Sequence, residues 1–216
     1  PNWRSWSPTA SPSRYLPIIE TVIANSQTTA GTGDDGIDVE ALSSVARTLN
    51  FRLTVRDNVP YSASAPVKVG QTSFDNMVVT VNGTAGPFIV TAPKTNGSWS
   101  VGSSKIITWD VAGTTANGVN AANVDIFLST DGGYTYPIVL ATNVPNDGSE
   151  TVVVPNNIGT ANRVMIKGAN HIFYDISDMD FAIVATTSTF DISCAAQDQI
   201  FNCTGNVSYS INYQAL

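Results

Sequence analysis

The sequence predicts an all-β fold built from β-sandwiches, and three observations support this. Charged residues make up 12% of the chain, about half the roughly 25% that is usual. Thr, Ser, Asn, Val and Gly, which favour strands and turns, are abundant instead. Apolar and polar residues alternate strictly from residue 47, and seven short strand patterns separated by turn residues follow residue 87.

The alternation begins in residues 47–56, where Leu49, Phe51, Leu53 and Val55 share one face and polar residues share the other. A period of two predicts a half-buried strand. A second strand is expected at residues 75–82. We expect residues 1–86 to comprise an irregular N-terminal segment, with a weak helical pattern at 13–25, and a first sandwich-like unit closed by these strands.

The next unit is expected over residues 87–185, where short strands recur between turns. Strands of this length and spacing indicate a β-sandwich of the immunoglobulin or fibronectin type III kind. Trp109 lies in the middle of one strand and is expected to fill the core. The predicted strands cover residues 88–91, 105–111, 123–129, 138–141, 150–154, 163–168 and 181–185.

Residues 186–216 begin with a Thr/Ser linker and contain two further strand patterns, at 190–194 and 206–213. Two strands cannot bury a core alone. We therefore expect an incomplete third β unit, which either is the start of a further sandwich or lends a strand to another sheet. The fold class is thus all-β, with tandem immunoglobulin/fibronectin-like sandwiches and an incomplete C-terminal unit.

Cys194 and Cys203 are the two cysteines of the chain. They are either free thiols or a short disulfide, and the extracellular character of the rest of the sequence favours the disulfide. Two cysteines and a single histidine do not make a zinc site.

The charge balance excludes several partners. The net charge is −7, and the ten Lys and Arg residues are scattered, so the cationic stripe that nucleic-acid binding requires is not expected. No apolar run reaches the roughly 18 residues needed to cross a bilayer, so membrane insertion is not expected. Pro1 cannot be a translation start, so we expect a processed chain or an excerpt.

Calcium is the metal that the sequence favours, because clustered Asp and Asn oxygens suit it. The main candidate ligands are Asp57, Asn58 and Asp75, which flank two predicted strands. Two further acidic clusters are weaker candidates, and none of the three matches the EF-hand spacing. These weaker clusters are Asp34, Asp35 and Asp38, and Asp175, Asp178 and Asp180.

The segment STDGGYTY (residues 129–136) is similar to an Asp-box, S-x-D-x-G-x-T-aromatic. In sialidase-like propellers this motif is structural. We expect a tight turn in which the Asp131 side chain ties the backbone, the glycines take positive φ and an aromatic ring packs beneath.

Several stretches resemble one family. They are VARTLNFRLTVRDN (45–58), MVVTVNGTAGPF (77–88), ITWDVAGT (107–114), VDIFLSTDGG (124–133) and PNDGSETVVVP (145–155). Together they resemble the region that follows the catalytic domain in secreted reprolysin-like zinc metalloproteases of Bacteroidetes-type bacteria. The resemblance implies fibronectin-like and immunoglobulin-like repeats in a secreted protein. The protease needs an H-E-x-x-H helix, whereas this chain has one histidine, His171, so protease activity does not carry over.

We therefore expect a non-catalytic accessory or adhesion module, secreted or at the cell surface. Its partners would be other domains of the parent protein, copies of itself, or a surface polysaccharide or protein. One alternative is a structural subunit of a fibre or surface layer, assembled by strand exchange or head-to-tail packing. Another is a carbohydrate-binding module in which Tyr134, Tyr136 and Tyr174 form a stacking platform.

Overall fold

The computed structural model describes residues 11, 13–29, 40–57 and 59–186. Within them regular structure is almost entirely β, and the one helix is α1 (Ile19–Ile23). The all-β prediction is therefore confirmed. The predicted third β unit, with Cys194 and Cys203, lies outside the described residues.

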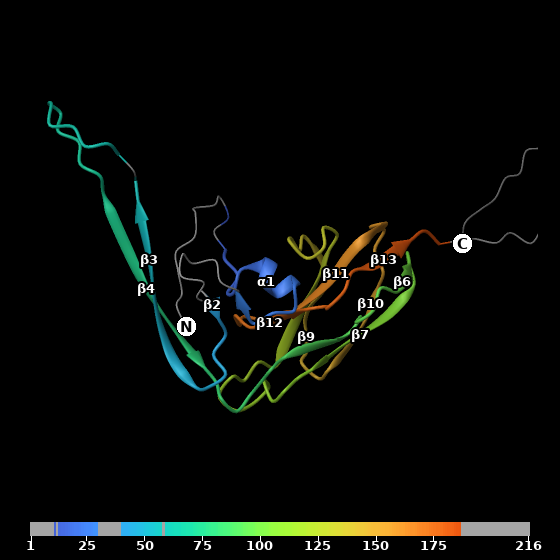
Figure 1. Cartoon of the computed structure of the whole chain (residues 1–216). Helices are drawn as coiled ribbons and strands as arrows, with labels where there is room; N and C mark the ends of the chain where they lie inside the picture. Colours follow the sequence, from blue (N-terminus) through green and yellow to red (C-terminus); the bar gives the residue numbers. More distant parts are fainter. Residues whose placement is uncertain (1–10, 12, 30–39, 58, 187–216) are drawn as a thin grey trace, which may run out of the picture. The chain divides into compact units, whose positions relative to one another are not determined.

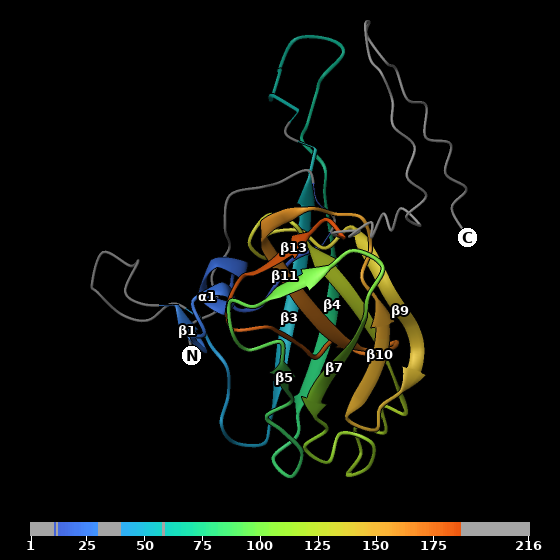
Figure 2. The ribbon, with the colours of Figure 1, turned by 90° about the vertical axis from the view of Figure 1, so that its right-hand side faces the viewer.

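Two sheets form a sandwich (Figure 1, Figure 2). The smaller sheet has the order β10-β7-β5, and the larger has the order β6-β13-β11-β8-β9, with β12 paired to β11. All pairs are antiparallel except β13 with β6. The strands are β5 (Ile89–Ala92), β6 (Ser98–Ser100), β7 (Ser104–Asp110), β8 (Asn123–Ser129), β9 (Ile138–Pro145), β10 (Ser149–Val153), β11 (Gly159–Gly168), β12 (Tyr174–Ile176) and β13 (Phe181–Val184).

The core lies between these sheets, because alternate residues of each strand point inward. Strand β8 contributes Val124, Ile126 and Leu128, all fully buried. Burying a side chain of this size stabilises a fold by roughly 1.5–3 kcal/mol, so the sandwich has its own hydrophobic core. The other buried members are Val90, Trp99, Ile107, Trp109, Val152, Val154, Val164, Ile166, Phe181 and Ile183.

Trp109 fills the core as predicted, with 4% of its surface exposed. Its indole Nε1–H donates to Asn146 Oδ1 at 2.8 Å. The Asn146 amide nitrogen donates to Thr114 Oγ1 and to the Ala121 carbonyl, each at 3.0 Å. Buried polar groups need such partners, so Asn146 connects the Trp109 strand to the loop before β8 without leaving its amide group unsatisfied.

The N-terminal segment packs on the sandwich through polar contacts. It contains α1 and the short pair β1 (Thr28–Thr29) and β2 (Glu40–Ala41). Glu40 is fully buried, pairs with Arg14 and accepts the Ile18 amide at 2.9 Å. Arg163 of β11 donates to the Ile23 carbonyl at 3.0 Å, which joins this segment to the larger sheet.

Strands β3 (Arg47–Arg56) and β4 (Thr72–Val81) form a separate two-stranded antiparallel ribbon, drawn as two long arrows in Figure 1. The pairing is regular from Arg47 opposite Val81 to Arg56 opposite Thr72. The alternation predicted here is confirmed, but the predicted burial is not, because Leu53 is 69% and Val55 59% exposed. Within the described residues no second sheet covers this face.

The seven strands predicted over residues 87–185 all occur. Their ends differ from the predicted ones by a few residues, most at β9 and β11, which extend to Pro145 and begin at Gly159. Strands β6 and β12 were not predicted, because three residues are too few to show a period.

Replacing Asn146 by Ala is expected to lower the free energy of unfolding by about 2–4 kcal/mol, because the Trp109 N–H and the Ala121 carbonyl lose their buried partner. Urea unfolding followed by circular dichroism measures the change. The exposed Asn156→Ala is the control and should stay within about 0.5 kcal/mol of the parent. Equal stability of the two variants would contradict the role given to Asn146.

Candidate docking surface

The structure places Asp57 and Asp75, two of the three predicted calcium ligands, at separate positions along the ribbon. Asp57 follows β3, and its Oδ1 accepts the amides of Val59 at 3.1 Å and Gln71 at 3.0 Å. Asp75 lies opposite Leu53 and accepts the Asn76 amide. It is four residues beyond Gln71 along β4, which is about 13 Å at strand spacing. Asn58 lies outside the described residues.

The other acidic clusters are accounted for in part. Asp178 pairs with Lys94 at 3.4 Å and Asp180 with Arg163 at 2.6 Å. Asp175 accepts the Val90 amide at 2.7 Å, and burial raises its pKa. Asp34, Asp35 and Asp38 lie outside the described residues. Among the residues that the structure describes, no group of three His, Cys, Asp or Glu side chains could hold a metal ion.

The Asp-box-like segment forms the expected turn after β8. Asp131 Oδ1 accepts the amides of Tyr134 and Thr135 at 3.0 Å, and Oδ2 accepts the Thr135 hydroxyl at 2.6 Å. Ser129 Oγ donates to Asp131 Oδ1 at 2.6 Å and accepts the Gly133 amide at 2.8 Å. Partial burial opposes ionisation of Asp131, but these hydrogen bonds outweigh it and lower the pKa to about 2.

The turn requires a glycine at position 133. Its φ is +101°, and a Cβ there would lie 3.1 Å from Tyr136 Oη and 3.2 Å from Ile23 Cγ1. Both the backbone conformation and the close approach therefore disfavour a side chain. The segment is a structural device that seats the N-terminal segment against the sandwich.

The three tyrosines of the predicted stacking platform differ in exposure. Tyr134 is 52% exposed, whereas the hydroxyl oxygens of Tyr136 and Tyr174 are buried. Burial raises the pKa of both phenols well above the ordinary value. The Tyr174 ring meets Tyr15 edge to face, with centroids 5.3 Å apart. Tyr136 and Tyr174 are thus half-buried, with their hydroxyl groups turned inward, whereas Tyr134 is exposed.

His171 lies in the bend after β11. Its amide donates to the Gly168 carbonyl at 2.9 Å, and its ring lies against Phe173, with centroids 5.7 Å apart. The position of the imidazole is thus set by its packing against Phe173.

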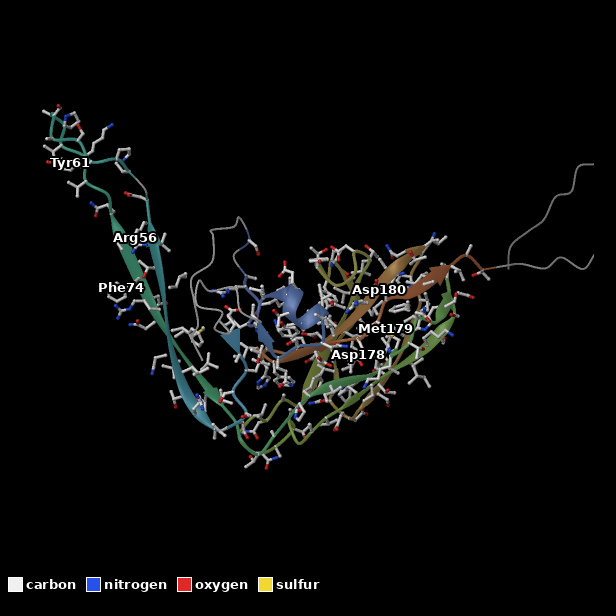
Figure 3. All side chains as sticks on the ribbon, viewed as in Figure 1. Arg56, Tyr61, Phe74, Asp178, Met179 and Asp180 are labelled. Carbon is white, nitrogen blue, oxygen red and sulfur yellow. The ribbon has the colours of Figure 1, made fainter. Side chains whose placement is uncertain are left out.

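The β3–β4 ribbon is the most exposed β surface that the structure describes. One face carries Leu49, Phe51, Leu53 and Val55 opposite Val79, Met77, Asp75 and Ser73. Figure 3 shows where Arg56, Tyr61 and Phe74 lie on the ribbon and its loop. Exposed apolar patches of this kind mark interaction sites. The large apolar side chains exposed on the ribbon and loop are Leu53, Val55, Val59, Tyr61, Val67, Val69, Phe74, Met77 and Val78.

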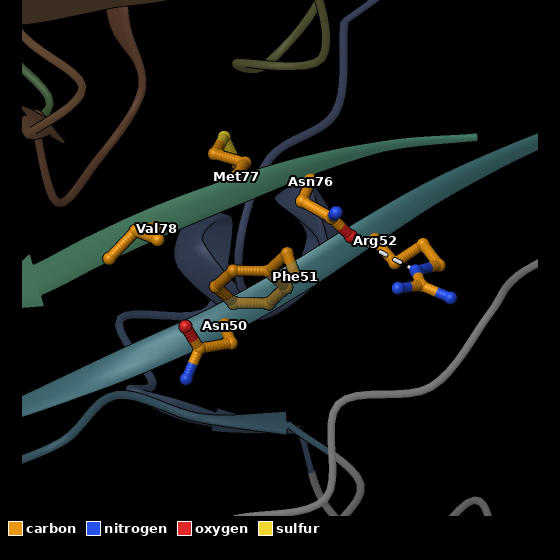
Figure 4. A pocket seen from close by; sticks show the side chains of 6 residues that line it. All are labelled: Asn50, Phe51, Arg52, Asn76, Met77 and Val78. Atoms are coloured by element: carbon orange, nitrogen blue, oxygen red, sulfur yellow. Dashed lines mark hydrogen bonds between the residues drawn. The ribbon is translucent and has the colours of Figure 1, made fainter.

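A shallow hollow lies midway along the ribbon, lined by Asn50, Phe51, Arg52, Asn76, Met77 and Val78 (Figure 4). The residues that line it come from both strands and from both faces of the ribbon. The hollow therefore extends around the ribbon and does not enclose a small molecule. Such an open shape suits a polypeptide segment better than a buried ligand.

Arg52 is held on the second face of the ribbon by its cross-strand neighbours. Its Nε donates to Asn76 Oδ1 at 2.9 Å, and its guanidinium carbon lies 4.2 Å from the centroid of the Phe74 ring. A guanidinium over an aromatic face is attracted electrostatically and loses part of its freedom. The positive charge of Arg52 is therefore held at a defined position on this face of the ribbon.

The ribbon also has two open edges. It is a two-stranded sheet, so in the described residues the outer edges of β3 and β4 have no strand neighbour. Backbone N–H and C=O groups along such an edge are a template for another strand. The sequence signalled the two strands and their apolar face, but the alternation did not reveal that the face and edges are open.

A scan of protein-family models and a search of curated proteins both find no match to this chain. Over the described residues, no helix has the length and apolar character to cross a membrane. The functional interpretation therefore depends on the geometry of the chain itself.

Asp131→Asn is expected to reduce stability in a pH-dependent way. Because the folded pKa lies below the ordinary 3.8, the contribution of the carboxylate is complete above about pH 4 and is lost as pH falls through about 2. The side chain is exposed, so solvent screening keeps the loss near roughly 1 kcal/mol.

Chemical unfolding between pH 7 and pH 2 tests this expectation. The difference between the parent and Asp131→Asn should shrink toward pH 2. Asp147→Asn, which removes a carboxylate that accepts one turn amide, should cost less at pH 7. A difference that does not vary with pH would rule out the ionised turn.

Proposed function

We propose that this chain is a non-catalytic docking module, in which the β3–β4 ribbon binds another polypeptide and the sandwich serves as its support. The observation that carries the proposal is the exposed apolar face of the ribbon. Leu53 and Met77, 69% and 50% exposed, lie on it as diagonal neighbours two rungs apart in the ladder.

A lone two-stranded sheet is marginally stable in water, yet this one runs for ten paired residues on each strand. Leucine, phenylalanine and valine repeat on one face, which is the pattern of a sheet that packs against another layer. A covering polypeptide would remove this apolar area from water and supply the missing stability.

The sandwich supports the accessory role. Its strand order resembles that of immunoglobulin-type domains, with β8, β11 and β13 adjacent in one sheet and β7 beside β10 in the other. We propose that it belongs to this type and acts as a rigid spacer. The resemblance to regions that follow a secreted protease domain is in keeping with an extracellular accessory module, and we propose that setting for it.

A photo-cross-linker in place of Leu53, in the protein as it occurs in the cells that make it, tests docking. The matched control carries the cross-linker in place of Val153, which is 66% exposed but lies on the sandwich. We expect cross-linked peptides from position 53, identified by mass spectrometry, to map to one discrete polypeptide segment. Position 153 should give few products. Products equally scarce at both positions would refute a docking role for the ribbon.

A further inference from the structure

We propose that the outer edge of β3 takes up an extended polypeptide segment as a third strand, and that it selects a segment in which apolar residues alternate with acidic and hydroxyl residues. This inference depends on the docking function proposed above and adds the chemistry of the partner. It follows from the charge on β3, the spacing of that charge and the pleat of the ribbon.

Strand β3 carries three of the ten cationic residues of the chain. The chain has ten Lys and Arg residues and a net charge of −7, yet Arg47, Arg52 and Arg56 all lie on β3. None of the three is ion-paired within the described residues. Strand β4 carries no cation, and its one charged residue is Asp75. The β3 edge is therefore a local cationic strip on an acidic protein, which favours an anionic partner.

The spacing of the arginines sets the partner's pattern on one face. Arg52 and Arg56 share the face opposite Leu53, with Thr54 between them, and lie about 13 Å apart along the strand. Residues directly opposite one another in paired strands share a face, with Cβ atoms about 4.5–5.5 Å apart. An added strand would therefore place acidic residues four positions apart, with a hydroxyl or amide residue midway.

The other face of β3 sets the remaining positions. Phe51, Leu53 and Val55 point there, so the alternate residues of the added strand would be apolar and would extend the apolar face. Main-chain hydrogen bonds supply affinity in strand addition, whereas alternating side chains supply specificity. The preferred segment then follows the pattern acidic–apolar–hydroxyl–apolar–acidic.

The same charges disfavour a second copy of β3 as the occupant. Antiparallel edge-to-edge pairing of two β3 strands would set Arg47 opposite Arg56 in the register centred on the strand, and Arg52 opposite Arg52 in the register shifted by one residue. Like charges directly opposite one another destabilise a sheet. The positive edge therefore acts against self-pairing while it favours an acidic strand.

A peptide pair tests the inference on the 216-residue chain. The probe is a nine-residue fluorescent peptide of alternating valine and polar residues, with Thr and Glu taking turns at the polar positions. Its match has Lys for each Glu. By fluorescence anisotropy we expect the Glu peptide to bind at least about tenfold more tightly, with an advantage that shrinks as salt rises because exposed charges are screened. Equal binding of the two peptides would overturn the inference.

Charge reversal gives the specific readout. Arg52→Glu with Arg56→Glu should reverse the preference, so that the Lys peptide binds at least about tenfold more tightly than the Glu peptide. Arg56→Glu alone should reduce the ratio of the affinities for the Glu and Lys peptides. It should leave the Arg52 contacts with Asn76 and Phe74 in place. Lys105→Glu on β7 is the control and should leave the preference unchanged. A double variant that still prefers the Glu peptide would contradict the role of the two arginines.

The two proposals fail in different ways. If position 53 cross-links to a discrete segment while the peptides bind alike, docking stands and the acidic pattern is wrong. If position 53 gives no product, the docking function itself fails. Sedimentation velocity adds a third outcome, since a chain that dimerises until Arg52 and Arg56 are reversed would have a second copy as its occupant, which also overturns the inference.

Discussion

An apolar sheet face must be covered, and the two β assemblies of this chain meet that requirement differently. In the sandwich each sheet covers the other, and Asn146 satisfies the one indole N–H that Trp109 brings into the core. The ribbon has a single ladder and no facing layer in the described residues, so Leu53 and Val55 stay in water. Because the two sheets of the sandwich already bury each other's apolar faces, an external polypeptide would stabilise the molecule most by binding to the ribbon.

Much of the fold could be predicted from the sequence because strands leave a local signal. The period of two and the turn residues located the seven strands after residue 87, and Trp109 lies buried as expected for an aromatic in mid-strand. The Asp131 turn was also predictable, since its hydrogen bonds join residues at most four apart. Strands β6 and β12 were not, because each is three residues long and owes its place to pairing with distant strands.

Only part of the candidate site could be predicted from the sequence. Alternation shows which side chains share a face, but the covering layer is a tertiary property, so the exposure of Leu53 could not be foreseen. The calcium prediction for Asp57 and Asp75 depended on the register of the hairpin, and its long loop leaves that register undetermined before the structure is known. The three arginines Arg47, Arg52 and Arg56 already lay within the strand predicted at residues 47–56, but the sequence did not show that this strand has an edge without a strand neighbour in the described residues.

Hydrogen–deuterium exchange of the 216-residue chain, measured alone and with the Glu peptide in excess, tests most directly whether a polypeptide covers the ribbon. Amides of β3 and β4 are expected to exchange rapidly in the chain alone and at least about a hundredfold more slowly when the peptide is bound. Amides of β7 and β8 should be protected alike in both samples. Equally fast exchange of the ribbon in both would mean that nothing binds there, and would contradict the central claim.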